Sequence, residues 1–492
     1  MNEVQKNLNH LMGKKYIQIF KDKFGMIYVS ISGMQGMAAQ AYPLHSRRLT
    51  TSLKKVYLTY YNELLSSQDI QYIYELLEVL YADKAETVEV CKRIYNDGYQ
   101  YAYELNAEDG TAVWVEDGEV SIEKVEGIVF KHSANYANQV IPNLDTDRSK
   151  LLYYISKHFN IQSDSERKLL ALYLVTSLWG LSINHPVLIV TGEKGSSKST
   201  TLRKLERLID PKTSDLSGIP KGADGLELRL SNSYFVPIDN LSSLSRRRSD
   251  TLARSSTGGS ETKRALYTNM DEIVLDIKAV VALNGVSIVA KESDLLDRSL
   301  IIRLERLSSK EICTEEELWA EFEKDRPAIL GCCFQILALA LNDKEPIQTE
   351  EKIRMADFHV ACIHAGRVIG ISEKEVSRIL WANQKSVNQY TIDESMVALC
   401  VLELMKDRQK YINSMTGLLK ELKEIAEDSG MSSKVIPESP NHLRIRLDMV
   451  QNNLETEYGI FYVVKNVGTF KKITLEKKCE KFAKVATEEK TK

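Results

Sequence analysis

One continuous stretch, residues 187–200, constrains the fold of this chain more than any other. It reads Val-Leu-Ile-Val-Thr-Gly-Glu-Lys-Gly-Ser-Ser-Lys-Ser-Thr. The pattern predicts a buried strand, a Gly-rich loop and the start of a helix. That order directs loop N–H groups and the positive end of a helix dipole toward one point, which suits anionic phosphate oxygens.

The spacing of this stretch indicates a site for ATP and Mg²⁺. In the pattern G-x-x-x-x-G-K-[ST], the Lys reaches the β and γ phosphates and the hydroxyl residue binds Mg²⁺. Here Ser197 replaces the second Gly, and Gly195 lies two residues earlier. A chance Gly/Ser loop is the alternative, but the flanking strand and helix favour the site. The expected nucleotide-binding residues, which we call the phosphate loop, are Gly192, Glu193, Lys194, Gly195, Ser196, Ser197, Lys198, Ser199 and Thr200.

Composition is that of an ordinary globular protein of several domains. The chain has 492 residues, 43% hydrophobic and 27% charged, with a net charge of −3. We expect two to four domains, and any nucleic-acid binding must come from local basic patches. The longest nearly apolar run, Ala328–Leu341, is too short to span a bilayer, so no membrane partner is expected. Seven Cys without paired spacing favour a cytoplasmic location. His359, Cys362 and His364 cannot share one helical face, so no metal is expected there.

Four regions follow along the chain. Residues 1–145 predict a small α+β domain, and residues 146–310 predict an α/β core with a parallel sheet and crossover helices. Ser163 and Glu166 form a capping-box signature before that sheet. Residues 311–390 predict a helical connecting region, and residues 391–492 predict a separate unit.

Polar residues end the strands that follow the phosphate loop. Asp239-Asn240 follows the apolar run Tyr234–Ile238. A carboxylate there suits a ligand for nucleotide-bound Mg²⁺, together with Ser199. Asn240 can orient water but cannot accept its proton. The alternative is that Asp239-Asn240 merely turns the chain.

Two further residues complete the expected catalytic set. Asn284 ends the next apolar strand, where an amide would lie near the γ-phosphate. Arg298 follows Asp294 and precedes the strand Ser299–Leu304. An Arg at the edge of such a domain is suited to reach a neighbouring subunit's γ-phosphate. Alone, the Asp294/Arg298 pair would be an ordinary surface ion pair.

This ordered set resembles a P-loop AAA+ ATPase core. It is similar in layout to superfamily-three and minichromosome-maintenance helicases, as found in replication proteins of phages, plasmids and chromosomal islands. The resemblance covers about residues 165–345. It implies phosphate and Mg²⁺ roles for Lys198 and Ser199, an acidic strand end at Asp239, a sensor at Asn284 and an arginine finger at Arg298. It also implies a homo-oligomer, in the form of a hexameric ring. Ser197 and Asn240 depart from the family pattern and predict modest turnover.

A predicted hairpin lies where the resembling helicases place a DNA-gripping hairpin. Residues 263–277 predict two strands around the turn Asn269-Met270-Asp271. Lys263 and Arg264 near its base are candidate DNA contacts, but the acidic tip would repel phosphate. The run Arg246–Arg248 predicts a solvated face, with DNA or a neighbouring subunit as alternative partners.

The C-terminal unit predicts a winged-helix domain. Expected helices at Glu394–Asp407, Thr416–Asp428 and Pro440–Tyr458 precede a hairpin at Phe461–Ile473. From residue 465 to 492 there are nine Lys and four Glu, a basic patch able to bind DNA. A solubilising tail on a protein-binding winged helix is the alternative. The candidate DNA contacts are Arg444, Arg446, Lys465, Lys471 and Lys472.

The N-terminal unit gives the weakest functional signal. Arg47-Arg48 and Lys54-Lys55 alternate with Tyr57, Tyr60 and Tyr61. Such interleaving suits single-stranded nucleic acid, but the helical spacing of the Tyr residues favours core packing. A primase would require a pair of carboxylates at strand ends, and this unit shows no convincing pair.

The sequence therefore predicts a DNA helicase or replication ATPase of a mobile genetic element. It would hydrolyse ATP at subunit interfaces to unwind or remodel single-stranded or duplex DNA. A nucleotide-gated replication initiator with little turnover is one alternative. An AAA+ protein-remodelling ATPase, such as a helicase loader or defence NTPase, is another.

Overall fold

The computed structural model divides into two compact units. The first unit contains residues 1–289 and 302–379, and the second contains residues 290–301 and 380–492. The domain boundaries expected at residues 145, 310 and 390 remain predictions. The described residues are 2–32, 40–124, 127–220, 222, 225–241, 244–264, 272–285, 292–308, 313–349, 351–393, 395–429, 436–467 and 470–477.

The N-terminal part of the first unit contains three helices and a four-stranded sheet. Three helices pack on a sheet of order β3-β2-β1-β4, around buried residues that include Leu8, Leu53 and Ile73. These elements are α1 (Glu3–Gly13), β1 (Ile17–Lys21), β2 (Ile27–Ile31), β3 (Gln40–Pro43), α2 (Arg47–Tyr61), α3 (Ser67–Leu76) and β4 (Glu86–Thr87). Helix α1 was not predicted, although its face of Val4, Leu8 and Leu11 has helical spacing.

A second sheet, in which every pairing is antiparallel, follows in chain order. Its strands are β6 (Ile94–Asn96), β7 (Tyr101–Glu104), β8 (Thr111–Glu116) and β9 (Glu119–Lys124), in that spatial order. The short strands β5 (Val90–Cys91) and β10 (Val129–Phe130) pair in parallel beside it. Strands β7 and β8 contain most of the buried residues of this sheet.

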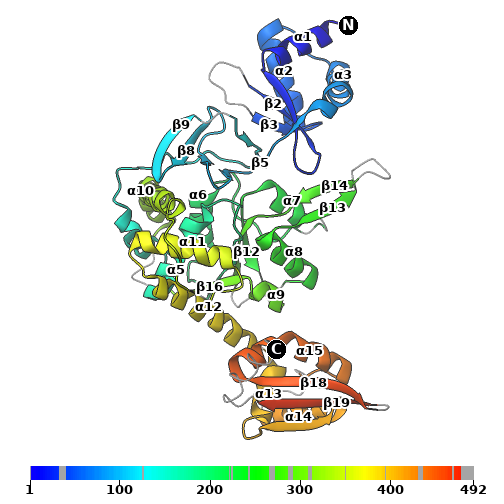
Figure 1. Ribbon diagram of the computed structural model, residues 1–492, viewed down its shortest axis with the longest axis vertical. Coiled ribbons are helices and arrows are strands. Elements are labelled where there is room, and N and C mark those ends of the chain that lie inside the picture. Colours follow the sequence, from blue (N-terminus) through cyan, green and yellow to red (C-terminus); the bar gives the residue numbers. More distant parts are fainter. Residues whose placement is uncertain are drawn as a thin grey trace. The chain divides into compact units, whose positions relative to one another are not determined.

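A four-stranded sheet of order β12-β15-β11-β16 forms the centre of the first unit (Figure 1). Its strands are β11 (Val187–Gly192), β12 (Phe235–Leu241), β15 (Val280–Gly285) and β16 (Ser299–Leu304), of which residues 302–304 belong to this unit. Strand β15 pairs in parallel with both β11 and β12. The strands are nearly all apolar and buried, as expected for a parallel sheet covered on both faces.

Helices surround this sheet. Helices α6 and α8 contact it directly, and α5, α10 and α11 pack together beside it. Gly331 lets α10 approach a loop closely, since a Cβ there would lie 1.9 Å from the Asn143 carbonyl oxygen. The helices are α4 (Leu151–His158), α5 (Asp164–Ser177), α6 (Lys198–Ile209), α7 (Gly225–Asn232), α8 (Arg246–Thr257), α10 (Glu315–Leu341) and α11 (Ala356–Ile369).

The predicted capping box of α5 differs from the structure. Ser163 Oγ accepts the Glu166 N–H at 3.4 Å, as expected. The Glu166 carboxylate, however, accepts the backbone N–H of Arg303 at 3.3 Å. Glu166 therefore joins α5 to β16, because a strand edge with an unpaired N–H lies within its reach.

The base of the hairpin predicted for residues 263–277 is present in the first unit. Strand β13 (Ser260–Arg264) pairs with β14 (Glu272–Asp276), and Arg264 lies opposite Glu272. The predicted tip, Asn269-Met270-Asp271, lies outside the described residues.

The second unit contains the predicted helices and hairpin, with one additional strand. Strand β17 (Lys410–Ser414) was not predicted; it pairs with β19 and gives a sheet of order β17-β19-β18. The core includes Leu418, Leu447 and Leu475. The elements are α13 (Met396–Leu404), β17, α14 (Met415–Asp428), α15 (Pro440–Tyr458), β18 (Ile460–Val467) and β19 (Phe470–Lys477), preceded by α9 (Ser293–Leu296) and α12 (Glu373–Asp393), which begins in the first unit. Among the described residues, no helix is both long and apolar enough to cross a membrane.

Candidate nucleotide-binding site

The phosphate loop connects β11 to α6 through backbone conformations that most side chains avoid. Gly195 has φ +79° and Ser197 has φ +66°. A Cβ at Gly192 would lie 2.3 Å from the Leu304 carbonyl oxygen of β16, so only Gly fits there. Ser197 begins α6 from the left-handed region without a side-chain cap. Its conformation shows why the motif normally has Gly at this position.

Lys198 lies in the first turn of α6 and folds back over the loop. Its Nζ donates to the carbonyl oxygens of Gly192 at 2.7 Å and Glu193 at 2.6 Å. Burial lowers the pKa of the Lys198 ammonium, and the nearby Asp239 carboxylate opposes that shift. The ammonium is thus held at the mouth of the loop by carbonyl oxygens that phosphate oxygens could replace.

Asp239 is the point at which three elements of the core meet. Its Oδ1 accepts a hydrogen bond from Ser199 Oγ of α6 at 2.8 Å. The same Oδ1 accepts a second from Asn284 Nδ2 of β15 at 2.6 Å. The structure therefore brings together the residues expected to bind Mg²⁺, Ser199 and Asp239, and the residue expected to act as sensor.

Asp239 and Asn240 lie near the carboxyl end of β12, where the sequence predicted them. The strand continues to Leu241, and its register against β15 shifts between Ile238 and Leu241. Asn240 has φ +55°, a conformation that Asn adopts more readily than most residues. Its backbone N–H donates to Asn284 Oδ1 at 2.6 Å. A bulge therefore turns Asp239 toward α6 while Asn240 stays exposed.

The donor set fits a nucleotide with its magnesium ion. A hydroxyl and a carboxylate oxygen, from Ser199 and Asp239, are ligands that Mg²⁺ prefers. The loop offers Gly195, where a Cβ would have no atom within 4 Å, and a helix N-terminus for anionic oxygens. The site therefore has the composition that a phosphate-bound cation requires.

A pocket of about 330 Å³ borders the phosphate loop and was not predicted from the sequence. Ser197, which precedes α6, forms one side together with Thr200 and Thr201 of that helix. The segment before α5 forms another side, with Phe159 and Asn160 among its residues. Asn160 Nδ2 donates to the Glu305 carbonyl oxygen at 2.5 Å, which fixes that segment beside the end of β16. No motif marks this pocket, because its two sides are about forty residues apart.

Arg298 belongs to the second unit. Its guanidinium forms an ion pair with Asp294 across 3.0 Å, one helical turn earlier. The Arg298 side chain is 18% exposed and that of Asp294 51%. The local geometry is thus the i, i+4 pair that the sequence allowed, and the arginine-finger role stays a prediction.

The candidate DNA contacts lie in both units. Lys263 and Arg264 are in β13, but their side chains lie outside the described residues, as does that of Lys471. On α15, Arg446 is exposed and Arg444 lies 3.7 Å from Asp448. Lys465 of β18 and Lys472 of β19 are both exposed and directly opposite each other in the hairpin. Two ammonium groups at opposed positions repel each other, and an anion would relieve that repulsion.

The Arg246–Arg248 run has a mixed environment. Arg246 is exposed, Arg247 lies 3.9 Å from the buried Glu227 carboxylate, and Arg248 donates to the Pro220 carbonyl oxygen at 3.1 Å. Two of the three side chains therefore have local partners, in keeping with a structural face.

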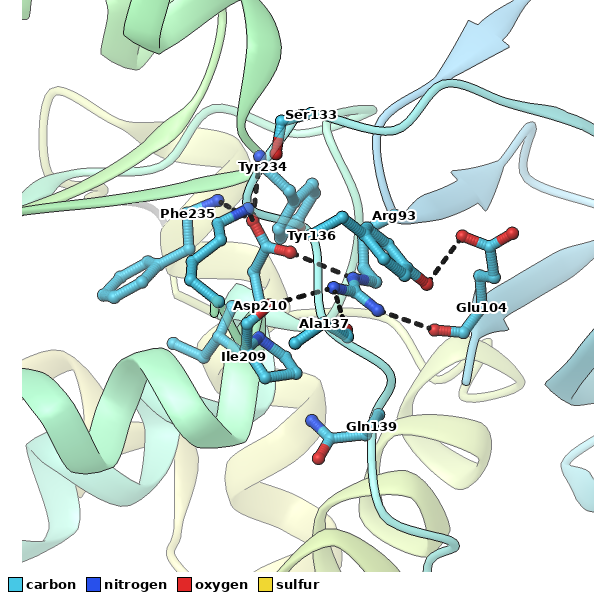
Figure 2. A network of polar contacts seen from close by, with 12 residues as sticks. Arg93, Glu104, Ser133, Tyr136, Ala137, Gln139, Ile209, Asp210, Tyr234 and Phe235 are labelled. Atoms are coloured by element: carbon cyan, nitrogen blue, oxygen red, sulfur yellow. Dashed lines mark hydrogen bonds and ion pairs between the residues drawn. The ribbon is translucent and has the colours of Figure 1, made fainter. Parts of the chain in front are cut away.

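A buried polar network joins this core to the second sheet (Figure 2). Arg93 is fully buried, and its Nε donates to Asp210 Oδ1 at 2.9 Å. Its other nitrogens donate to the carbonyl oxygens of Glu104, Ala137 and Pro211. Every direction of the guanidinium thus has a partner, as burial of a charge requires.

Asp210 connects that network to the candidate site. It caps the C-terminal end of α6, which begins at the phosphate loop. Its Oδ2 accepts the backbone N–H groups of Tyr234 and Phe235 at 3.1 Å each, at the start of the strand that contains Asp239. Sequence reasoning missed Arg93 and Asp210, since a lone Arg and a lone Asp carry no signal without their spatial pairing.

The residues considered for a metal have other roles. His359 is buried; its ring accepts the Ile353 N–H at 3.2 Å and contacts Ser377 Oγ at 3.0 Å. His364 pairs with Asp343 at 2.7 Å. These contacts are structural.

One protein-family model matches part of the chain. Residues 155–380 match the model of the actinomycete integrative conjugative element replication protein. This part of the chain is similar to replication proteins of mobile elements. The matched segment contains the phosphate loop, Asp239, Asn284 and Arg298.

The solved structures similar to the chain include two of the NrS-1 C-terminal region. An A-form apo structure of the NrS-1 C-terminal region is 12% identical, with a TM-score of 0.40, and covers 95% of this chain and 97% of that one. A second apo structure of that region is 10% identical, with a TM-score of 0.40, and covers 97% and 100% respectively. No curated protein matches the chain.

Proposed function

We propose that this protein is an AAA+ ATPase that acts on DNA during replication of a mobile genetic element. It would hydrolyse ATP at subunit interfaces and use the energy to unwind or remodel DNA. The observation that carries the proposal is the convergence of Ser199 and Asn284 on Asp239 Oδ1, beside the phosphate loop. The match of residues 155–380 to a replication-protein family supports the DNA-directed role.

Each residue of the site has a role in this proposal. Loop N–H groups and Lys198 bind the phosphates, and Ser199 with Asp239 holds Mg²⁺, which neutralises developing phosphate charge. Asn284 orients Asp239, to which it donates a hydrogen bond. The pocket lined by Phe159, Asn160 and Thr201 would take the nucleoside part of ATP, because it opens beside the same loop.

The second unit supplies a candidate duplex-binding surface. Its order of helix, strand, two helices and hairpin, with a sheet of order β17-β19-β18, supports a winged-helix assignment. The opposed Lys465 and Lys472 and the exposed Arg446 would contact phosphates.

The decisive experiment measures ATP hydrolysis alone, with single-stranded DNA and with duplex DNA, beside strand displacement on a forked substrate. We expect DNA to stimulate hydrolysis, and Lys198→Ala to lower the rate at least about 100-fold, since a charge that stabilises the transition state is lost. Lys374→Ala, an exposed Lys elsewhere in the first unit, is the matched control. Absence of any DNA response would reject the DNA-directed role and favour an ATPase that remodels proteins.

One observation favours a second function, that of a nucleotide-gated replication initiator. Asn240 occupies the position after the acidic residue, and its amide cannot accept a proton from water. ATP would then assemble the protein on DNA and be hydrolysed slowly. ATP-dependent DNA binding without strand displacement, at a turnover below about one per minute, would support the initiator and exclude the helicase.

A further inference from the structure

A large cavity lies in the first unit, on the N-terminal helix α2. It has a volume of about 860 Å³, within the range of ligand sites. One side is formed by β3 and α2, and the other by residues 107–108, the segment 132–138 and Thr213. Its walls therefore come from distant parts of the sequence that the fold brings together.

The α2 side of this cavity is basic. Arg47, Arg48 and Lys55 all line it, and all three are exposed. Arg48 Nη1 donates to the carbonyl oxygens of His132 at 3.2 Å and Ser133 at 3.0 Å, which ties the two walls together. The backbone carbonyl oxygens of Arg47 and Lys55 accept hydrogen bonds from Thr51 and Thr59. Within the described part of the chain, the side chains of Arg47 and Lys55 form no ion pair. Glu108 is the acidic residue of the lining.

Aromatic and hydroxyl groups complete the walls. Tyr42 and Tyr136 line the cavity, as do Ser46, Ser52 and Thr213. Tyr136 is held in place by the Arg93 guanidinium, 3.8 Å from its ring centre, and by a hydrogen bond from its hydroxyl to Glu104 at 2.8 Å. A fixed aromatic ring beside cationic side chains is the combination that binds bases together with phosphates.

The aromatic residues that the sequence placed beside these bases have other roles. Tyr57 is buried and donates to the Val4 carbonyl oxygen at 3.0 Å, and Tyr61 contacts His10 at 2.7 Å. Tyr60 stacks on Tyr16 at 5.0 Å. The predicted core packing of Tyr57 is therefore correct, while the basic residues of the same helix face a different pair of Tyr residues.

We propose that this cavity binds a single strand of nucleic acid, with Arg47 and Lys55 on its phosphates and Tyr42 and Tyr136 beside its bases. A single strand is favoured over a duplex because Tyr42 and Tyr136 line the same cavity as the cations, and only an unpaired strand can present its bases to aromatic rings. This site is separate from the candidate nucleotide site, so the proposal does not depend on ATP hydrolysis.

The experiment measures binding of a fluorescent oligothymidylate by anisotropy, with the full chain and without nucleotide. The double variant Arg47→Ala/Lys55→Ala should weaken binding roughly tenfold and reduce the slope of log K against log salt by about 1.4, since each lost phosphate contact contributes about 0.7 for single strands. The control Lys6→Ala/Lys14→Ala removes two exposed positive charges elsewhere on the same unit. It should leave both quantities within about twofold.

A second measurement locates the strand directly. Photocrosslinking of an oligonucleotide that contains 5-bromodeoxyuridine should label peptides that include Tyr42 or Tyr136. Parallel titrations with oligouridylate and with duplex of equal length distinguish RNA and duplex ligands from single-stranded DNA. Unchanged affinity in the double variant, or crosslinks confined to other segments, would overturn the proposal. DNA-independent ATP hydrolysis should stay at the wild-type rate in Arg47→Ala/Lys55→Ala, which separates failure of this site from failure of the ATPase.

Discussion

At the scale of single residues, Ser197 is the strained position of the phosphate loop. Its φ of +66° costs an L residue about 1–2 kcal/mol, while Gly loses about 0.5–1 kcal/mol more entropy on folding. We therefore expect Ser197→Gly to stabilise the protein by about 0.5–1 kcal/mol, measured by urea denaturation. Ser197→Ala keeps the strain and should change stability by less than about 0.5 kcal/mol. Equal effects of the two variants would contradict this explanation.

Asp239, Ser199 and Asn284 show how much of the site the sequence revealed. Each was predicted because it ends a strand or begins a helix beside the loop. The bulge at Asn240 was not predicted, since a register shift depends on the neighbouring strand β15. The shared acceptor, Asp239 Oδ1, is likewise a tertiary feature.

At the scale of elements, the Arg93–Asp210 pair holds α6 and β12 against the second sheet. Removing Arg93 leaves the carbonyl oxygens of Glu104, Ala137 and Pro211 without this donor, although Lys212 still pairs with Asp210. Breaking a buried ion pair costs about 3–5 kcal/mol. We expect that loss of stability for Arg93→Ala in urea denaturation. Arg203→Ala breaks the exposed pair with Asp215, whose side chain is 68% exposed, and should cost under about 1 kcal/mol. A cost for Arg93→Ala no larger than that for Arg203→Ala would show that the network contributes little.

Helix α6 also contains a buried carboxyl whose charge opposes folding. Burial raises the pKa of Glu206 to about 7. Because the folded pKa exceeds the unfolded value, the destabilisation is fully present above pH 7 and disappears as the pH falls toward 4.5. Glu206→Gln should therefore raise stability by about 1–2 kcal/mol at pH 8, with a smaller gain at pH 5.

The measurement is chemical denaturation of both proteins across this pH range. Glu119→Gln, which neutralises an exposed carboxyl on β9, should show no such trend. A gain from Glu206→Gln that does not depend on pH would contradict the assigned cause.

At the scale of the whole molecule, the proposed function requires a site completed by a neighbouring subunit. Lys198→Ala would abolish hydrolysis at the phosphate loop of the variant subunit itself. Arg298→Ala would abolish hydrolysis at the phosphate loop of the neighbouring subunit. In an equal mixture with random assembly, about one quarter of interfaces combine both intact residues. We therefore expect the mixture to recover about a quarter of wild-type ATPase activity. A mixture as inactive as either variant alone would reject a shared site.

The sequence by itself determined the phosphate loop, the strands beside it and most helices of the second unit. These features depend on residues close together in the sequence: the Gly and Ser residues between β11 and α6, apolar runs that fill a parallel sheet, and Pro440 in the first turn of α15. Local spacing is sufficient for them, because helices, strands and tight turns are set by contacts a few residues apart.

Only the tertiary structure decided which distant polar groups meet. Arg93 reaches Asp210 across 117 positions of sequence, and Arg48 reaches the carbonyl oxygens of the segment that faces it across the basic cavity. Strand β17 is also of this kind, since its five residues form a strand by pairing with β19. Such contacts require loop closure and desolvation that no local pattern records. The phosphate loop could thus be found in the sequence, whereas its supporting network and the basic cavity could be found only in the fold.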